Sequence, residues 1–198
     1  NDSKLIAFFG RVNYDYDKKY YLSLSLRREG SSKFGFDYKW GNFPAASVAW
    51  MITEEKFFPK LPWLDELKLR ADYGETGNQD FGNYLSLDTY TGYGYYTYNG
   101  VSYQVWGPSQ NTNYDLRWEK AKNFNAGLDF ELAKNRLSGS LNYYVRTNSD
   151  LLGNYNVPVP PNVQPSTFAN VGSMRNSGLE IQLNGTPYSS KDFIYTVT

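Results

Sequence analysis

The clearest pattern in the chain is the alternation of apolar and polar side chains along residues 20–28. The even positions Tyr20, Leu22, Leu24 and Leu26 are apolar, whereas most of the odd positions between them are polar. A period of two residues indicates a β-strand with one apolar and one wet face. With Glu29 included, the run reaches the length of about 9 to 11 residues that a tilted strand needs to cross a bilayer, whereas a usual strand has about five or six. The pattern therefore favours the wall of a transmembrane barrel.

Further segments alternate in the same way, so that about eight strands are expected. They are residues 5–16, 43–53, 66–74, 118–132, 137–147, 178–184 and a last strand that begins at Phe193 and extends to Thr198.

The connections between these strands differ in length in a regular order. We expect short turns at 17–19, 133–136 and 189–192, a medium connection at 54–65, and long connections at 30–41, 75–115 and 148–168. Short strand pairing is possible within 75–115, because a structureless loop of this length is unusual. The longest connections all fall on one side, which is the asymmetry of an outer-membrane barrel with short periplasmic turns and long external loops. A soluble sandwich or lectin-like domain also alternates and remains the alternative.

Composition narrows the possible functions. The 20 basic and 20 acidic side chains cancel, so there is no electrostatic footprint for nucleic acid and no nucleic-acid partner is expected. Cysteine and histidine are absent, which excludes disulfides, thiol chemistry, histidine metal sites and histidine acid-base catalysis. The mean hydropathy is −0.62, and only a barrel crosses a membrane with so polar a sequence, because its inward residues stay hydrated.

Two groups of carboxylates raise the question of an active site or a metal site. Asp129 and Glu131 lie two positions apart, and a carboxylate pair is what a glycosidase uses. Alternate residues on one strand face are also the ordinary lining of a barrel, so we expect no enzyme. Asp80 and Asp88 lie near glycines, but no loop has the regular ligand spacing of an EF-hand. We therefore expect no metal and no cofactor.

Short motifs follow one another along nearly the whole chain. They are GRVNY at 10–14, KYYL at 19–22, REGSSKFG at 28–35, WG at 40–41, FPA at 43–45, LKLR at 67–70, YG at 73–74, TGNQ at 76–79, WEK at 118–120, GLD at 127–129 and Gly178 with Glu180 and Ile181. In content and order these motifs resemble the SusC/RagA group of TonB-dependent outer-membrane transporters of Bacteroidetes.

The resemblance implies a fold and a function. The fold is a transmembrane antiparallel up-and-down β-barrel of about 22 strands, of which residues 1–198 are expected to supply about eight, with the plug domain and the barrel ends absent. The function is nutrient import, in which the barrel wall lines the passage for an oligosaccharide or peptide. The implied partners are a SusD-like surface lipoprotein, the TonB-ExbB-ExbD complex and outer-membrane lipid, and the implied location is the outer membrane of a Gram-negative bacterium, crossed many times. The alternatives are a soluble carbohydrate-binding β-sandwich and a small self-contained outer-membrane pore.

Two sets of residues are candidates for contact with substrate or partner. The first set lies on the polar side of the expected strands, where it would line the lumen; the alternative is a solvated wall of mutually paired charges. These residues are Arg27, Glu29, Lys68, Arg70, Asp72, Asp129, Glu131, Arg146 and Glu180. The second set is a run of aromatic residues whose rings would stack on sugars or pack against a partner protein, unless the loop packs on itself. These residues are Tyr90, Tyr93, Tyr95, Tyr96, Tyr98, Tyr103 and Trp106.

Overall fold

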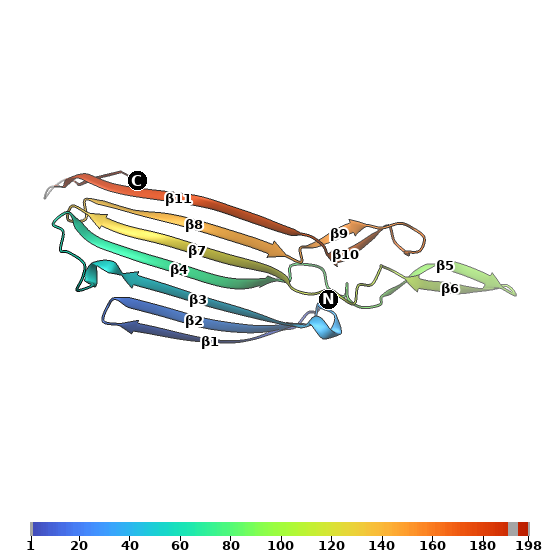
Figure 1. Cartoon of the computed structure of the whole chain (residues 1–198). Helices are drawn as coiled ribbons and strands as arrows, with labels where there is room; N and C mark the ends of the chain where they lie inside the picture. Colours follow the sequence, from blue (N-terminus) through green and yellow to red (C-terminus); the bar gives the residue numbers. More distant parts are fainter. Residues whose placement is uncertain (1, 190–193, 198) are drawn as a thin grey trace.

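Eight long strands form one antiparallel sheet in the computed structural model, which describes residues 2–189 and 194–197 (Figure 1). The spatial order is β1-β2-β3-β4-β7-β8-β11-β12, so each strand of the sheet lies beside the next one along the chain once the two small hairpins are set aside. The strands are β1 (Leu5–Tyr16), β2 (Tyr20–Ser31), β3 (Trp40–Met51), β4 (Leu64–Asn78), β7 (Glu119–Leu132), β8 (Leu137–Ser149), β11 (Ser173–Ser189) and β12 (Ile194–Val197). Among the described residues, no helix has the length and apolar character needed to cross a membrane.

The pairing registers gather the apolar positions on one face of the sheet. Leu24 lies opposite Val12 on β1 and Ala46 on β3. Farther across the sheet, Leu141 lies between Leu128 and Ile181. This face is not covered: Leu24 keeps 46% and Ile181 66% of its surface exposed. The soluble sandwich is therefore not supported, since it needs a second sheet over these side chains and the described residues supply none.

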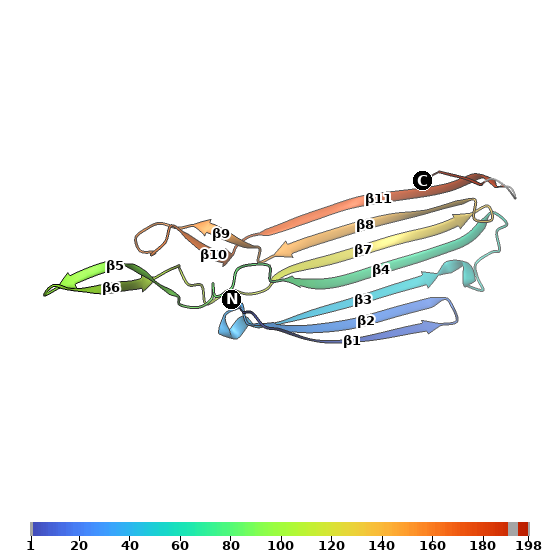
Figure 2. The same cartoon turned by 180° about the vertical axis from the view of Figure 1, so that it is seen from behind.

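The short and long connections lie at opposite ends of the sheet (Figure 2). Residues 17–19 and 133–136 form tight turns, with positive φ angles at Asp17, Lys18 and Ala133 among others. The expected turn at 189–192 and the start of the last strand at Phe193 fall largely outside the described residues, which resume with β12.

Several strands are longer than the pattern predicted, and the first long connection is shorter as a result. The connection expected at 30–41 is confined to 32–39, with a short 3-10 helix, η1 (Phe36–Tyr38). The glycine that suggested a loop is a strand residue: Gly30 pairs with Ile6 and Trp40. A Cβ at Gly30 would lie 2.9 Å from the Trp40 ring, so glycine serves close packing there. β3 ends at Met51, before a second 3-10 helix, η2 (Ile52–Glu54), and β4 and β11 extend beyond the predicted 66–74 and 178–184.

The two longest connections contain hairpins that project from the same end of the sheet (Figure 1). The first hairpin consists of β5 (Tyr90–Tyr98) and β6 (Val101–Pro108), which are joined by Asn99 and Gly100 with positive φ. The second consists of β9 (Leu152–Asn156) and β10 (Ser166–Asn170). Each hairpin forms a sheet of its own, separate from the wall.

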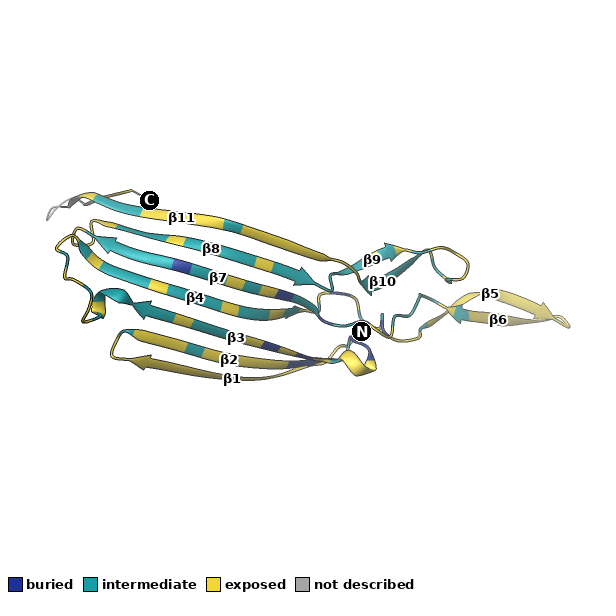
Figure 3. Cartoon of the chain, viewed as in Figure 1, coloured by how far each residue is buried: buried dark blue, intermediate teal, exposed yellow. Residues whose placement is uncertain are grey.

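The only cluster of buried apolar residues in the described part of the chain lies at this loop end (Figure 3). Phe34 packs against Trp118 and Phe81 with ring centroids 4.7 and 5.2 Å apart, and Phe43 meets the edge of Trp118 at 5.4 Å. The cluster takes residues from all three long connections: it consists of Phe34, Phe43, Phe81, Leu116 and Trp118, with Leu85, Leu152 and Phe168 packed against it. We call these eight residues the loop core. It fixes the three connections to one another.

Candidate functional site

All nine charged residues that the sequence placed on the polar side lie on one face of the sheet. Lys68 pairs in register with Asp129, and Arg146 lies between Asn123 and Asn176. On β2, Arg27 is opposite Phe43 of β3. Ala49 lies on the same face of β3 as Phe43 and is opposite Arg70 of β4. That this face lines a passage remains a prediction, and we call it the polar face.

Several of these charges pair with one another at the centre of the polar face. Arg70 Nε lies 3.0 Å from Asp129 Oδ2, and Lys68 Nζ lies 4.0 Å from the same oxygen. Arg70 also donates a hydrogen bond to Asn142, and Asp72 accepts one from Asn125 at 3.2 Å. These charged side chains therefore have partners within the wall. This agrees with the alternative that the polar side is a solvated wall of mutually paired charges.

The structure does not bring Asp129 and Glu131 together as a free carboxylate pair. Asp129 is engaged by Arg70 and Lys68, whereas Glu131 lies opposite Glu66 at the turn end of the sheet. Arg146 donates to Asn148 at 3.3 Å, and Glu180 forms no ion pair with the described residues. Nor do the described residues contain a group of His, Cys, Asp or Glu side chains suited to a metal ion.

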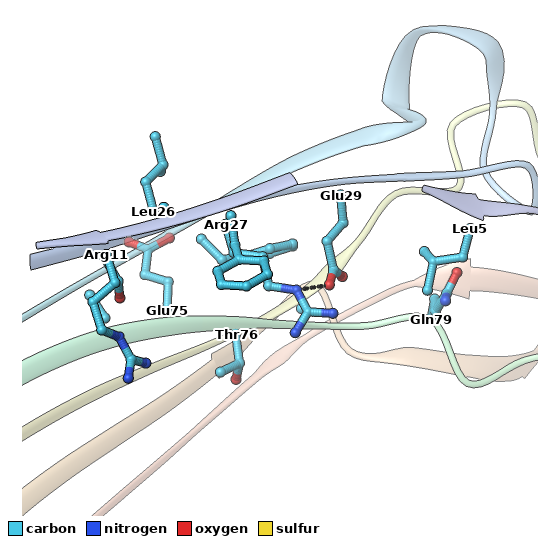
Figure 4. Close-up of a pocket in the computed structure, with 14 residues that line it drawn as sticks. Leu5, Arg11, Leu26, Arg27, Glu29, Glu75, Thr76 and Gln79 are labelled. Atoms are coloured by element: carbon cyan, nitrogen blue, oxygen red, sulfur yellow. Dashed lines mark ion pairs between the residues drawn. The ribbon is translucent and has the colours of Figure 1, made fainter. Parts of the chain in front are cut away.

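A cavity of about 630 Å³ opens on the polar face near the loop end (Figure 4). It forms where β3 and β4 separate, because their pairing ends at Ala45 and Gly74 although both strands continue. The ring of Phe43 fills the gap and requires Gly77 beneath it: a Cβ there would lie 2.2 Å from the ring. The cavity wall therefore shares Phe43 with the loop core.

The charged groups of the cavity differ in how far they are exposed. Arg27 and Glu29 form an ion pair in which the Arg27 side chain is 58% exposed and the Glu29 side chain only 9%. The Glu75 carboxylate is also largely covered, accepts a hydrogen bond from Tyr73 Oη at 2.6 Å and lies 3.8 Å from Lys122 Nζ. Arg11, in contrast, is exposed.

Two uncharged features complete the cavity. The side-chain oxygen of Gln79 is buried and has no hydrogen-bond partner in the described part of the chain. Phe9 and Phe43 supply apolar surface.

Sequence reasoning missed Arg11, Glu75 and Gln79 as cavity residues. Only Arg11 carried a usable signal, since it occupies an odd position of β1 and pairs in register with Ser25 on the face of Arg27.

The predicted aromatic residues all lie in the β5-β6 hairpin and are all exposed. One hairpin face carries Tyr96, Tyr98 and Tyr103 together with two valines, and the rings of Tyr96 and Tyr98 stack at 6.5 Å. Their exposed fractions are 59%, 58% and 53%, so the hairpin does not pack on itself on this face. A two-stranded hairpin by itself is marginal in water, and this one contains no charged residue.

Side-chain hydrogen bonds tie the base of this hairpin to the third long connection. Asn111 Nδ2 donates to the carbonyl oxygens of Gln164 and Ser166 at 2.7 and 2.9 Å, and Asn111 Oδ1 accepts from the backbone N–H of Val163 at 3.0 Å. Tyr114 Oη donates to both oxygens of Asp88 at 2.7 Å, and this bond lowers the pKa of the Asp88 carboxyl and raises the pKa of Tyr114. These hydrogen bonds therefore fix the base of the hairpin.

Comparison with known proteins agrees with the geometry of the sheet. The family model described as "TonB dependent receptor-like, beta-barrel" matches residues 1–198. TonB-dependent receptor P39 of Formosa agariphila is 41% identical over 98% of this chain, and TonB-dependent receptor SusC of Bacteroides thetaiotaomicron is 36% identical over 98%. The chain spans only 18% and 20% of the length of these two relatives.

Solved structures show the same likeness in three dimensions. The RagAB peptide importer in its "open-open" state matches with a TM-score of 0.86 at 36% identity, over 97% of this chain and 20% of that chain. The siderophore receptor PirA of Pseudomonas aeruginosa matches with a TM-score of 0.60 at 15% identity, over 98% of this chain and 34% of that chain, which supports the fold alone. The chain belongs to the TonB-dependent receptor family, of whose β-barrel it forms part of the wall.

Proposed function

We propose that the chain is a wall segment of an outer-membrane nutrient importer of the SusC/RagA type. The observation that carries this proposal is the two-sided sheet. One face is apolar and is exposed or only partly covered, and the opposite face is polar with paired charges. That division suits a wall with lipid on one side and a hydrated passage on the other. The relatives that match over nearly the whole chain are receptors rather than enzymes.

The turn end of the apolar face adds a second line of support. Rings of Tyr16, Tyr20, Trp50 and Phe57 follow one another with centroids 6.4 to 6.5 Å apart. Aromatic girdles at this level are typical of barrels where the lipid headgroups begin. A self-contained small pore is less well supported, because β1 and β12 form opposite edges of an open sheet. Unpaired edges are costly in hydrocarbon, so in this proposal the rest of a longer chain supplies the strands that complete the barrel, with a plug inside it.

The proposed partners depend on which end of the sheet faces outward. The loop end would face outward, towards a SusD-like lipoprotein and the arriving oligosaccharide or peptide. The exposed rings of the β5-β6 hairpin are the proposed contact for one of these. Energy would come from the TonB complex through parts of the protein beyond this chain. The solved relative of matching fold is described as a peptide importer, which supports the transport of a chain-like nutrient.

The test is the environment of the apolar face. Single cysteines at Leu22, Leu24 and Leu26 would be spin-labelled in the full-length protein in vesicles, and a cysteine at Ser23 on the polar face is the matched control. We expect the first three labels to collide with dissolved oxygen and be protected from a water-soluble nickel complex, and the control to show the reverse. Water access at all three leucines would exclude a membrane wall.

A further inference from the structure

We propose that the cavity of Figure 4 binds an oxyanion, namely the carboxylate of an acidic peptide or of an acidic sugar, through the guanidinium groups of Arg11 and Arg27. The proposal rests on the importer function above and names the chemical class of its cargo. Both arginines lie on the polar face, on the neighbouring strands β1 and β2. Figure 4 shows their head groups pointing to the same side of these strands.

The accessible charge of the cavity decides the sign of the ligand that it would bind. Formally the cavity is balanced, with two arginines against Glu29 and Glu75. The two carboxylates are covered, with side chains 9% and 14% exposed, and each already has a cationic neighbour. Arg27 is 58% exposed, and Arg11 is exposed and forms no ion pair with the described residues. The accessible charge is therefore positive.

A guanidinium presents a planar fork of donors that matches a carboxylate better than a neutral carbonyl, and the charge-assisted bond is roughly twice as strong as a neutral one. Arg11 has all its donors available among the described residues. Arg27 retains donors beyond the Nε that faces Glu29.

Gln79 and two phenylalanine rings offer contacts for the rest of the ligand. Gln79 Oε1 is a buried acceptor without a partner, and a buried group in this state is costly unless a donor reaches it. An amide N–H next to a peptide carboxylate, or a hydroxyl next to a sugar carboxylate, is such a donor. Phe9 and Phe43 would pack against the body of the ligand. An inorganic anion offers no body for this apolar surface, whereas a peptide or sugar does.

The experiment uses the purified full-length protein with its natural partner and two matched pairs of probes. One pair is a short peptide with a free C-terminal carboxylate and the same peptide as its amide. The other is trigalacturonate and its methyl ester. Binding is measured by calorimetry at low and at moderate salt. We expect the charged member of one pair to bind about tenfold more tightly than its neutral counterpart, as one charge-assisted hydrogen bond supplies, and the preference to shrink with salt.

Variants test which residues produce the preference. Arg11→Gln should reduce it to within about twofold, consistent with the loss of that bond. Arg27→Gln alone would leave Glu29 buried without its partner, so the second variant is Arg27→Gln with Glu29→Gln. The matched control is Arg136→Gln, which removes an exposed cation at the turn end of the sheet, outside this cavity.

The outcomes separate this proposal from the importer function. A preference in the peptide pair or in the sugar pair identifies the source of the carboxylate. Equal binding of charged and neutral probes, no binding of any probe, or an equal loss in Arg136→Gln would overturn the oxyanion site. Uptake of labelled nutrient by cells carrying the wild-type protein is measured separately, and its failure would count against the importer itself. The oxyanion proposal fails alone if uptake persists without any charge preference.

Discussion

The wall and the loop end of this chain are stabilised in different ways. The wall has long hydrogen-bonded strands and few buried side chains, and its apolar residues are exposed or only partly covered. The loop end has a packed aromatic core, in which Leu116 and Phe34 are 0% and 1% exposed, and it is joined by side-chain hydrogen bonds. The described residues therefore leave the apolar face of the wall uncovered, and lipid would cover it in the proposed importer, whereas the loops depend on their own side chains.

Removing the centre of the loop core should have the largest effect of the changes considered. Trp118→Ala deletes a ring that touches Phe34 and Phe43 and donates from Nε1 to the carbonyl oxygen of Lys39 at 3.1 Å. We expect the loop end to lose about 3–5 kcal/mol, the usual cost of Trp or Phe truncation in a core. Limited proteolysis of the full-length protein in detergent should then cut the long connections while the wall stays folded.

The control for this change is Phe8→Ala, which removes a ring that is 63% exposed on the apolar face. Its proteolysis pattern should match that of the wild type. Cleavage that spreads through β1–β4 in Trp118→Ala would show that the wall and the loop end are one cooperative unit, contrary to the division drawn above.

An added charge should destabilise the protein far more on the apolar face of the wall than on the polar face. Leu24→Arg places a guanidinium on the apolar face, where a lipid-facing charge near the middle of the bilayer costs about 2–4 kcal/mol. Ser25→Arg places the same group on the polar face one residue further along β2 and should cost far less. Equilibrium folding of the full-length protein into vesicles measures both. Equal costs for the two variants would show that the two faces do not differ in their contact with lipid.

The cavity links the two regions, and glycine substitutions test that link. Gly77→Ala directs a methyl group to within 2.2 Å of the Phe43 ring and 2.8 Å of Trp118. We expect it to destabilise the loop end by about 1–3 kcal/mol, as overpacking does. Gly74→Ala is the matched control on the same strand, because its Cβ would lie at an ordinary 3.5 Å from Ala45. Thermal unfolding followed by calorimetry compares the two, and a Gly74→Ala protein as unstable as Gly77→Ala would rule out this packing explanation.

The period of two was sufficient to predict the wall, because one covered or lipid-facing face imposes alternation on every strand. For the same reason all nine charged residues were placed together on one face. The strand ends were less predictable, since glycines such as Gly30 that lie under an aromatic ring have the same sequence signature as loop glycines.

The packing of the loop end could not be predicted from the sequence pattern. Its core joins Phe34, Phe81 and Phe168, which are far apart along the chain, and no local period connects them. One local feature of the sequence does indicate the β5-β6 hairpin. Asn99 and Gly100 between two aromatic runs are the residues that a tight hairpin turn requires, and both have positive φ. The cavity depends on where the β3-β4 pairing stops, which is a property of the sheet and not of either strand.

The smallest expected effect concerns the pH response of the hairpin base. Tyr114 Oη donates to the Asp88 carboxylate, and this bond lowers the pKa of Asp88 in the folded protein. Because the folded pKa lies below the unfolded one, the stabilisation is complete above the ordinary carboxyl pKa of about 3.9 and is lost as the pH falls through the lowered value. Both groups are solvent-exposed, so the effect should be confined to the hairpin and be weakened by salt. A spin label at Ser102 on β6 of the full-length protein should become more mobile below about pH 3.9. Tyr114→Phe removes the donor, and its label should show the higher mobility already at neutral pH and no further change on acidification. An unchanged acid response in Tyr114→Phe would mean that another carboxyl group controls the hairpin.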